Sequence, residues 1–302
     1  MMISLDELKA AAPAADISQY EPMSAHTTFK VGGPARFFIK PQSEEDIIGA
    51  LRVCRAAGTP VEVIGKGSNL LVSDKGFDGA IICIGEGFNR ASVDAEGITA
   101  RAGAGIVGLA SVAWRAGLSG MEFASGIPGS LGGAVLMNAG AYGGEMKDIV
   151  SSVTVIDKDL AVREIPGSEM NFRYRGSRAM DEGLVVIGAR LALAKGDRRQ
   201  IGIRMNELLT RRREKQPLEY PSAGSTFKRP EGHFAGALIE QAGLRGYSIG
   251  GAQVSEKHCG FVINKGDATA ADIMALCNYI TDKVEESSGI RLEMEVRRLG
   301  EF

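Results

Sequence analysis

The chain has 302 residues, 44% hydrophobic and 24% charged, which is typical of a globular protein of two or three domains. Its formal net charge of −2 gives no general attraction to nucleic acid or to an anionic membrane, and we expect neither as a partner. The longest basic run, Arg211–Arg213, is followed at once by Glu214. Glycine is over-represented, with 40 residues against a usual share of about 7%.

The cysteine and histidine pattern argues against a metal site. The four cysteines include no CxxC pair and there are only three histidines, so we expect no structural zinc and no other metal. Residues 1–17 lack a basic start and a long apolar run, and no apolar window of 18 residues occurs. The sequence therefore predicts a cytoplasmic protein without a signal peptide or a transmembrane helix.

The first part of the chain predicts a short helical lead-in at 1–19 and a small α+β unit at 20–85. Ser43 is expected to cap a helix, with Asp46 as its capping-box partner and Gly58 after its end. The elements predicted for this unit are a strand at 35–40, a helix from Ser43 to Ala57 and strands at 61–64, 69–72 and 80–84.

Two further α+β units are predicted, at 86–196 and 197–302. The elements predicted for the second unit are strands at 98–102, 152–157 and 184–193 and a helix at 106–117. Those predicted for the third unit are helices at 200–215 and 235–242, a strand at 260–264, a long amphipathic helix and a strand at 291–299. Thr269 and Asp272 are expected to cap the long helix.

Residues 103–108, GAGIVG, match the GxGxxG pattern of dinucleotide-binding folds, after a strand and before a helix. That fingerprint belongs in the first βα unit, whereas several predicted strands precede it here. No clean second strand ending in an acidic residue follows. The context therefore argues against a Rossmann site.

Two other glycine-rich stretches suggest a phosphate or cofactor site. Residues 65–72, GKGSNLLV, follow a predicted buried strand, and their N–H groups could form an anion-binding nest, although taken alone a tight turn is the simpler explanation. Residues 126–145, GIPGSLGGAVLMNAGAYGGE, mix seven glycines with apolar residues, which indicates a buried loop. Buried backbone polar groups need partners, and a large cofactor with a pyrophosphate would supply them.

Three polar stretches carry candidate catalytic groups. In NFRYRGS, at 171–177, an extended backbone would project Arg173 and Arg175 to one side, where they could bind a carboxylate or a phosphate, although a solvated loop is the simpler explanation. RLEMEVRR, at 291–298, alternates as a half-buried strand does and cannot say whether Glu293 or Glu295 is functional.

The third stretch, YPSAGSTFKRP at 220–230, places Ser225 beside Gly224 and two cations. It contains no GxSxG elbow, which argues against a serine hydrolase. The two cations, Lys228 and Arg229, instead suggest a serine that acts on an anionic substrate.

Together these pieces resemble one family. The residues at 26–36, 65–72, 126–145, 171–177, 220–230, 251–264 and 291–300 are similar to those of UDP-N-acetylenolpyruvoylglucosamine reductases. The resemblance runs from about residue 20 to the C-terminus, and the short connection between Arg175 and Ser225 resembles the type II form. The combination is far more specific than any one of its motifs.

The resemblance implies an α+β fold in which residues 20–85 and 86–196 form a two-part FAD-binding module of the vanillyl-alcohol-oxidase type. A smaller α+β domain at 197–302 would bind the UDP-sugar. The implied reaction reduces UDP-N-acetylglucosamine enolpyruvate to UDP-N-acetylmuramate in peptidoglycan precursor synthesis. It uses non-covalent FAD, with NADPH as the reductant, and the implied protein is a monomer.

The resemblance also implies roles for individual residues. Arg175 and Glu295 would stabilise the enolate, Glu295 with a raised pKa, and Ser225 would donate the proton. The implied cofactor-binding residues are Gly65, Lys66, Gly67, Ser68, Asn69, Leu70, Gly126, Ile127, Pro128, Gly129, Ser130, Gly133, Asn138, Ala139, Gly140, Ala141 and Tyr142. The implied substrate-binding residues are Lys215, Lys228, Arg229 and Gln253.

One departure and two alternatives remain. Cys259 stands where the family often has alanine or asparagine, before the phenylalanine of its KHxxF segment. A flavin oxidase of a hydroxy acid or sugar could use the same module, but such enzymes commonly hold the flavin covalently on His or Cys, and no histidine lies in the glycine-rich loops. A non-catalytic nucleotide-sugar-binding protein is the second alternative, which the presence of all three catalytic residue types disfavours.

Overall fold

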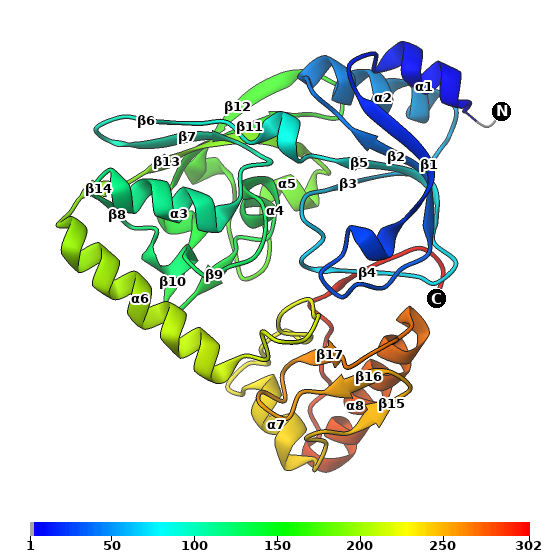
Figure 1. The fold of residues 1–302 in the computed structure, drawn as a ribbon, viewed down its shortest axis with the longest axis vertical. Helices are drawn as coiled ribbons and strands as arrows, with labels where there is room; N and C mark the ends of the chain where they lie inside the picture. Colours follow the sequence, from blue (N-terminus) through cyan, green and yellow to red (C-terminus); the bar gives the residue numbers. More distant parts are fainter. Residues whose placement is uncertain (1–2) are drawn as a thin grey trace. The chain divides into compact units, whose positions relative to one another are not determined.

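The computed structural model describes residues 3–302, and the chain divides into two compact units (Figure 1). Unit 1 comprises residues 1–19, 37–66 and 79–212, and unit 2 comprises 20–36, 67–78 and 213–302. Residues 20–36 and 67–78 thus group with the C-terminal part of the chain. The finer domain boundaries expected from the sequence stay a prediction.

The first sheet has the strand order β1-β2-β5-β3. Its strands are β1 (Asp16–Pro22), β2 (Pro34–Lys40), β3 (Val61–Ile64) and β5 (Phe77–Cys83), of which β3 and β5 are parallel. Helices α1 (Leu5–Ala11) and α2 (Glu44–Ala56) pack against each other beside this sheet (Figure 1). The predicted capping box of Ser43 and Asp46 is confirmed at the start of α2. The helical lead-in is confirmed only for α1, because β1 already begins at Asp16.

The second sheet lies in unit 1 and is antiparallel throughout, with the order β12-β11-β13-β7-β6. Its strands are β6 (Ala91–Val93), β7 (Gly97–Arg101), β11 (Val150–Ile156), β12 (Val162–Pro166) and β13 (Val185–Ala192). Helix α3 (Ile106–Arg115) follows β7 directly, as the GxGxxG match requires. The antiparallel pairing of β7 nevertheless excludes the parallel βαβ unit of a dinucleotide-binding fold, in agreement with the sequence argument.

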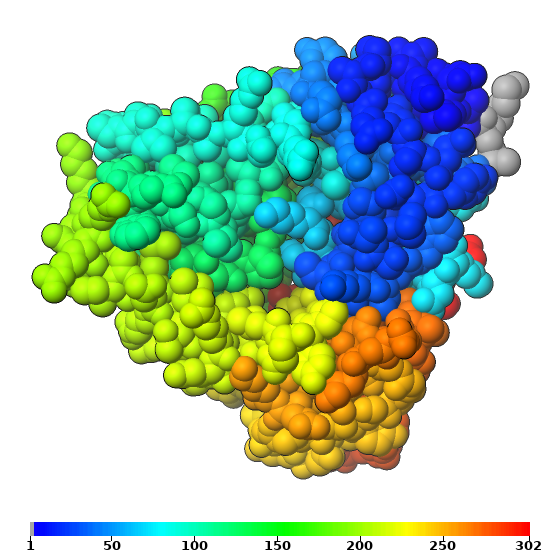
Figure 2. All heavy atoms as spheres, in the orientation of Figure 1, coloured from blue at the N-terminus to red at the C-terminus, as the bar shows by residue number. Residues whose placement is uncertain are grey.

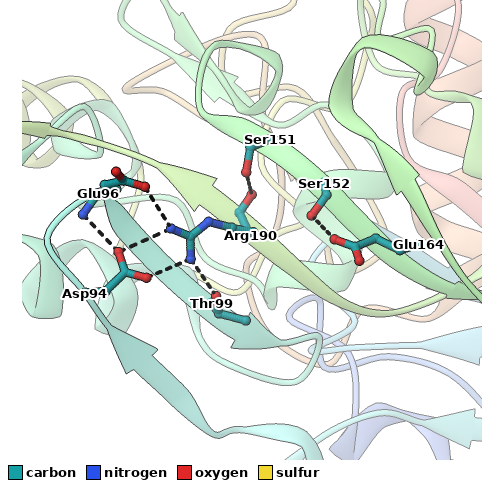
Figure 3. A network of polar contacts seen from close by, with 7 residues as sticks. All are labelled: Asp94, Glu96, Thr99, Ser151, Ser152, Glu164 and Arg190. Carbon is teal, nitrogen blue, oxygen red and sulfur yellow. Dashed lines mark hydrogen bonds and ion pairs between the residues drawn. The ribbon is translucent and has the colours of Figure 1, made fainter.

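One face of this sheet is polar. Thr99, Arg190 and Ser152 stand in register on neighbouring strands, and the Arg190 guanidinium bonds Asp94 and Thr99 at 2.8 and 3.2 Å (Figure 3). Exposed pairs of this kind contribute little to stability, typically about 0–1 kcal/mol. The same face forms part of a hollow of about 860 Å³ next to the start of α2, and that hollow contains none of the predicted site residues.

Helix α6 (Arg198–Lys215) runs along the edge of unit 1, next to strands β8 (Leu118–Ser119) and β14 (Ala194–Lys195) (Figure 1). Its buried residues are Ile201, Met205 and Leu208. The indole of Trp114 donates a hydrogen bond to the Arg198 carbonyl at 2.9 Å and fixes the start of the helix. Figure 2 shows the yellow-green atoms of α6 lying against the green atoms of the preceding residues of unit 1.

Unit 2 contains the sheet β15-β16-β17, with strands Ser248–Ile249, Ala252–Val254 and Val262–Asn264, and helices α7 (Ala235–Gln241) and α8 (Ala270–Ser288). Thr269 and Asp272 form the predicted capping box of α8, and its residues Ile273, Leu276, Ile280 and Val284 are fully buried. Asp74 adds a second cap, because its carboxylate accepts the N–H groups of Ala270 and Ala271 at 2.8 and 2.9 Å.

The last strand is shorter than predicted. Strand β18 covers Arg297–Leu299 and pairs in parallel with β4 (Leu70–Val72), whereas Met294 makes only an isolated bridge with Phe227. The remaining short elements are η1 (Met23–Ala25), η2 (Glu86–Phe88), η3 (Glu122–Ala124), α4 (Leu131–Leu136), β9 (Gly140–Ala141), β10 (Gly144–Glu145), η4 (Met146–Asp148), η5 (Gly167–Glu169) and α5 (Arg178–Asp181).

Across residues 3–302, no helix has both the length and the apolar character needed to cross a bilayer. The same residues contain no group of three or more His, Cys, Asp and Glu side chains arranged to hold a metal ion.

Candidate active site

The glycine-rich stretch 126–145 is partly helical rather than a plain loop, since α4 lies within it. Its backbone groups find protein partners: the N–H groups of Leu131 and Gly132 donate to the carbonyls of Ala104 and Ala102, both at 2.8 Å. The Gly103–Gly108 motif therefore has a structural role, because carbonyl groups in and beside it accept hydrogen bonds from the N–H groups at the buried start of α4. The protein itself therefore supplies hydrogen-bond partners for part of this stretch.

Asn138 organises the second half of the stretch. Its side chain is fully buried and donates to Glu145 Oε2 at 3.0 Å and to the Arg173 carbonyl at 3.1 Å. Its Oδ1 accepts the Lys147 N–H at 2.9 Å. All the polar atoms of this side chain thus serve the protein, so a cofactor contact at Asn138 would have to come from its backbone.

Arg173 and Arg175 do not project together from an extended segment, and the simpler explanation, a loop, agrees with the structure. Residues 173–176 form a tight hairpin in which Arg173 and Gly176 exchange two backbone hydrogen bonds at 3.0 and 3.2 Å. Arg173 pairs with Asp181 at 2.8 Å, whereas Arg175 packs over the Tyr174 ring. Arg175 has a φ of 54°, a conformation that a non-glycine residue keeps only where its surroundings hold it.

In unit 2, Ser225 is exposed on a loop whose next residue is firmly anchored. Thr226 is fully buried, and its Oγ1 accepts the Val262 N–H at 2.9 Å. Its N–H donates to the Gly260 carbonyl and its own carbonyl accepts the Glu295 N–H, both at 2.9 Å. Gly224 has a φ of +77° and open space beside it, so the turn itself requires glycine there.

Glu295 therefore lies on a segment bonded directly to the residue after Ser225, and the structure brings these two predicted catalytic residues together. A further bond holds this segment, because the side-chain amide of Asn69 donates to the Glu295 carbonyl at 3.1 Å. Glu293, the alternative acid, is exposed and forms an ion pair with Lys228 instead. The choice of Glu295 over Glu293 as the catalytic acid stays a prediction from the family resemblance.

The predicted phosphate loop is divided between the units: Gly65 and Lys66 belong to unit 1, and Gly67, Ser68, Asn69 and Leu70 to unit 2. Gly67 has a φ of 59°, and its carbonyl accepts the Thr28 N–H at 3.2 Å. Leu70 begins β4, and Ser68 is half-buried. A glycine is required at 67 because a Cβ there would run into the His26 carbonyl.

The predicted substrate-binding residues each have contacts within unit 2. The guanidinium of Arg229 lies 4.0 Å from the ring centroid of Phe234. The positive charge of Lys215 acts at His258, whose pKa is lowered by burial and then by Arg245 and Lys215. The side chain of Gln253 bonds the Gly246 carbonyl, Ser248 and Lys265.

Cys259, the departure from the family pattern, is buried in the apolar core of unit 2. Burial is the main cause of its raised pKa, which disfavours the reactive thiolate. The cysteine is therefore a core residue and leaves the predicted catalytic groups untouched.

Comparisons with known proteins identify the chain. The family model for FAD binding domains matches residues 35–165, and that for the C-terminal domain of UDP-N-acetylenolpyruvoylglucosamine reductase matches 216–299. The reductase of Agathobacter rectalis is 49% identical over 302 residues, covering 96% of both chains, and that of Caldanaerobacter subterraneus subsp. tengcongensis is 46% identical, covering 99% of both. The chain belongs to the UDP-N-acetylenolpyruvoylglucosamine reductase family.

A solved structure agrees with this assignment. UDP-N-acetylenolpyruvylglucosamine reductase from Thermus caldophilus superimposes with a TM-score of 0.80 at 36% identity, covering 95% of this chain and 99% of that one. The predicted family, the α+β fold with an FAD-binding domain and a C-terminal domain, and the oxidoreductase class are thereby confirmed. As a member of this reductase family, the chain is an FAD protein.

The glycines of unit 1 fit this cofactor. A Cβ at Gly65 would collide with the hydroxyl of Ser130, and one at Gly105 would lie 2.7 Å from the Lys66 ammonium. Gly105 and Ser130 are themselves bridged, so these groups form one cluster with a hydroxyl, a cation and exposed backbone. Such a cluster suits the pyrophosphate of FAD.

Arg212 is a candidate site residue that the sequence argument did not single out. It lies on α6 against the glycine-rich stretch, and a Cβ at Gly126 would be 2.8 Å from its Cδ. Its side chain is half-buried, and within residues 3–302 no carboxylate pairs with it. Burial lowers the pKa of the guanidinium, and Tyr142 opposes this shift. The sequence showed only the basic run Arg211–Arg213, which does not reveal which arginine faces inward.

Proposed function

We propose that this chain catalyses the reduction of UDP-N-acetylglucosamine enolpyruvate to UDP-N-acetylmuramate, with FAD as the bound cofactor and NADPH as the reductant. Membership of the reductase family supports the reaction class. The observation that carries the proposal is the placement of Ser225 and Glu295 on segments joined through Thr226, with the serine exposed and its neighbour buried.

Bound FAD supplies the hydride that adds to the terminal vinyl carbon of the enolpyruvyl group. The electron pair then moves into the substrate carboxylate, where Arg175 and Glu295 stabilise the developing enolate. Ser225 donates its proton to the adjacent carbon. A hydroxyl is a weak acid, but an enolate is strongly basic and nearby cations such as Lys228 favour the resulting alkoxide.

The UDP portion of the substrate carries negative phosphates, which explains the cationic residue types assigned to its binding. Lys215, Lys228 and Arg229 would bind phosphate oxygens, and Gln253 would donate to a neutral oxygen. Lys228 is held by Glu293, so substrate binding would exchange that carboxylate for a phosphate. The monomeric state and the cytoplasmic location remain predictions, and size-exclusion chromatography tests the first.

The FAD contacts assigned from the family resemblance, from Gly65 to Tyr142, belong to this proposal. We add Arg212 as the positive charge that faces an anionic part of the cofactor. Lys66 lies near Gly105, which is bridged to Ser130, and Arg212 lies near Gly126, four residues before Ser130. A cofactor bound along this stretch would thus meet two cations, of which we assign Lys66 to the pyrophosphate and Arg212 to the isoalloxazine ring.

An anaerobic two-step titration tests the function. Purified protein should show the visible flavin band, lose it on addition of NADPH and regain it on addition of UDP-N-acetylglucosamine enolpyruvate. Bleaching without recovery would reject the substrate. Protein purified without flavin and unable to take it up would favour the non-catalytic binding protein instead.

A further inference from the structure

Glu145 carries a partly buried carboxylate that the proposed mechanism does not use. It follows the predicted FAD contacts 138–142, and its side chain is 26% exposed. Asn138 uses one amide group to bond both Glu145 Oε2 and the Arg173 carbonyl, at 3.0 and 3.1 Å. The carboxylate is therefore fixed beside the backbone of the hairpin that carries Arg175.

The hairpin is attached to the same region at a second point. Ser177 is fully buried, and its hydroxyl donates to the Leu136 carbonyl at 2.9 Å. Leu136 is the last residue of α4 and precedes Asn138 closely in the sequence. Two buried polar side chains thus hold residues 173–177 against the end of α4. This double attachment explains how Arg175 is kept at a positive φ, since a strained residue persists only when its surroundings over-determine it.

The charges around Glu145 identify its electrostatic partners. The Lys147 ammonium lies 2.8 Å from Glu145 Oε2 and is the main cause of the lowered pKa of this carboxyl. Asn138 lowers that pKa further and so does the positive charge of Arg175, whereas partial burial opposes them. Lys147 is half-exposed, so its ammonium can leave the Glu145 carboxylate for water. Arg175, in contrast, lies on a hairpin whose backbone is fixed.

We propose that Glu145 is a positioning residue for Arg175: its carboxylate, fixed by Asn138, orients the Arg175 guanidinium for the substrate carboxylate. This inference rests on the proposed role of Arg175 in stabilising the enolate. Arg173 is assigned no such role, because Asp181 already holds its guanidinium. Asp181 thus serves Arg173, and we assign Glu145 to Arg175.

The test measures the two half-reactions separately in Glu145→Gln. Glutamine keeps an oxygen to accept from Asn138 and removes only the charge, so FAD content and the melting temperature should match the parent protein. Reduction of FAD by NADPH should be unchanged within about twofold, because Arg175 has no part in it. Reoxidation by the enolpyruvyl substrate should slow about tenfold, equivalent to about 1.4 kcal/mol.

Two further variants make the result decisive. Asp181→Asn removes the partner of Arg173 on the same hairpin and should leave both half-reactions within about twofold. In an Arg175→Lys background, Glu145→Gln should cause no additional slowing, since the orientation it provides is already lost. Additive slowing in the double variant, or slowing of both half-reactions by Glu145→Gln alone, would overturn the positioning role.

The outcome also separates this inference from the function on which it rests. If Arg175→Lys leaves reoxidation by substrate at the parent rate, the proposed role of Arg175 fails and Glu145 has nothing to position. If Arg175→Lys slows reoxidation but Glu145→Gln does not, the reductase mechanism stands and the inference alone is rejected.

Discussion

The side-chain amide of Asn69 donates a hydrogen bond to the backbone carbonyl of Glu295 across 3.1 Å, joining residues 226 positions apart in the sequence. The backbone continues the link, because the Asn69 carbonyl accepts the Arg297 N–H at 3.1 Å. The glycine-rich turn at 65–69 therefore has a structural role besides the phosphate binding proposed for it. It holds the segment that carries a proposed catalytic acid.

Replacing Asn69 with alanine should lower the free energy of unfolding by about 1 kcal/mol, the usual net value of one hydrogen bond. It should also slow substrate reduction several-fold, because the Glu295 backbone loses an anchor. Urea denaturation and steady-state kinetics measure the two effects.

Asn264→Ala is the matched control, since Asn264 also bonds a distant carbonyl, that of Phe29, at 3.1 Å. That variant should lose stability but keep its turnover within about twofold, and equal losses of turnover in both variants would contradict the link to Glu295.

Substitutions at Ser225 and Thr226 should have different effects, the first on the catalytic rate and the second on the free energy of unfolding. Ser225→Ala removes an exposed hydroxyl and should leave the melting temperature unchanged while turnover falls by about 10²–10⁴, the usual range for a general acid. Thr226→Val should instead lower the free energy of unfolding by about 1–3 kcal/mol, because the Val262 N–H loses its acceptor inside the core. Thermal melts and kinetics on both variants check this, and a stable, fully active Ser225→Ala protein would remove the proposed proton donor.

The sequence predicted those parts of the fold that local chemistry determines. The capping boxes at Ser43 and Thr269 and the buried face of α8 follow from short-range hydrogen bonds and helical periodicity, and both are confirmed. Strand β1 was missed because most of its residues are exposed and show no alternation of apolar side chains. The strand predicted at 291–299 was too long because alternation indicates an extended backbone, whereas a ladder also needs a partner strand.

The site was predicted through family resemblance, and its supporting contacts were not. Nothing local in the sequence shows that Asn138 bonds the Arg173 carbonyl or that Asn69 bonds Glu295, because these contacts join distant segments. Gly176 marks a turn in this segment, but nothing local shows that Arg175, rather than the glycine, takes the positive φ. Arg212 was missed because its neighbours Arg211 and Arg213 have the same charge, and only the phase of α6 distinguishes them.

Cys277 makes the protein sensitive to alkaline pH. Burial raises the pKa of its thiol to about 12, from an ordinary value of 9.0. Above pH 9 the unfolded chain loses this proton while the folded chain keeps it, so stability falls as pH rises between these two values. At pH 10.5 the loss from this one group should be about 2 kcal/mol. Urea midpoints at pH 8 and pH 10.5 should therefore differ less for Cys277→Ala than for the parent, and an equal difference would contradict the assignment.

Arg212 should influence the redox potential of the bound flavin. Two-electron reduction places negative charge on the isoalloxazine ring, and a half-buried cation without a carboxylate partner favours that reduced form. Arg212→Met should therefore lower the two-electron midpoint potential by about 30 mV or more, where about 30 mV corresponds to a tenfold change in the equilibrium constant. Spectroscopic titration against a reference dye measures this potential without turnover.

Arg211→Met is the control, because Arg211 is exposed one position earlier on α6 and pairs with Glu207 at 2.5 Å. Equal potentials in the two variants would show that Arg212 does not face the ring, and weaker FAD binding at an unchanged potential would assign it to the pyrophosphate instead.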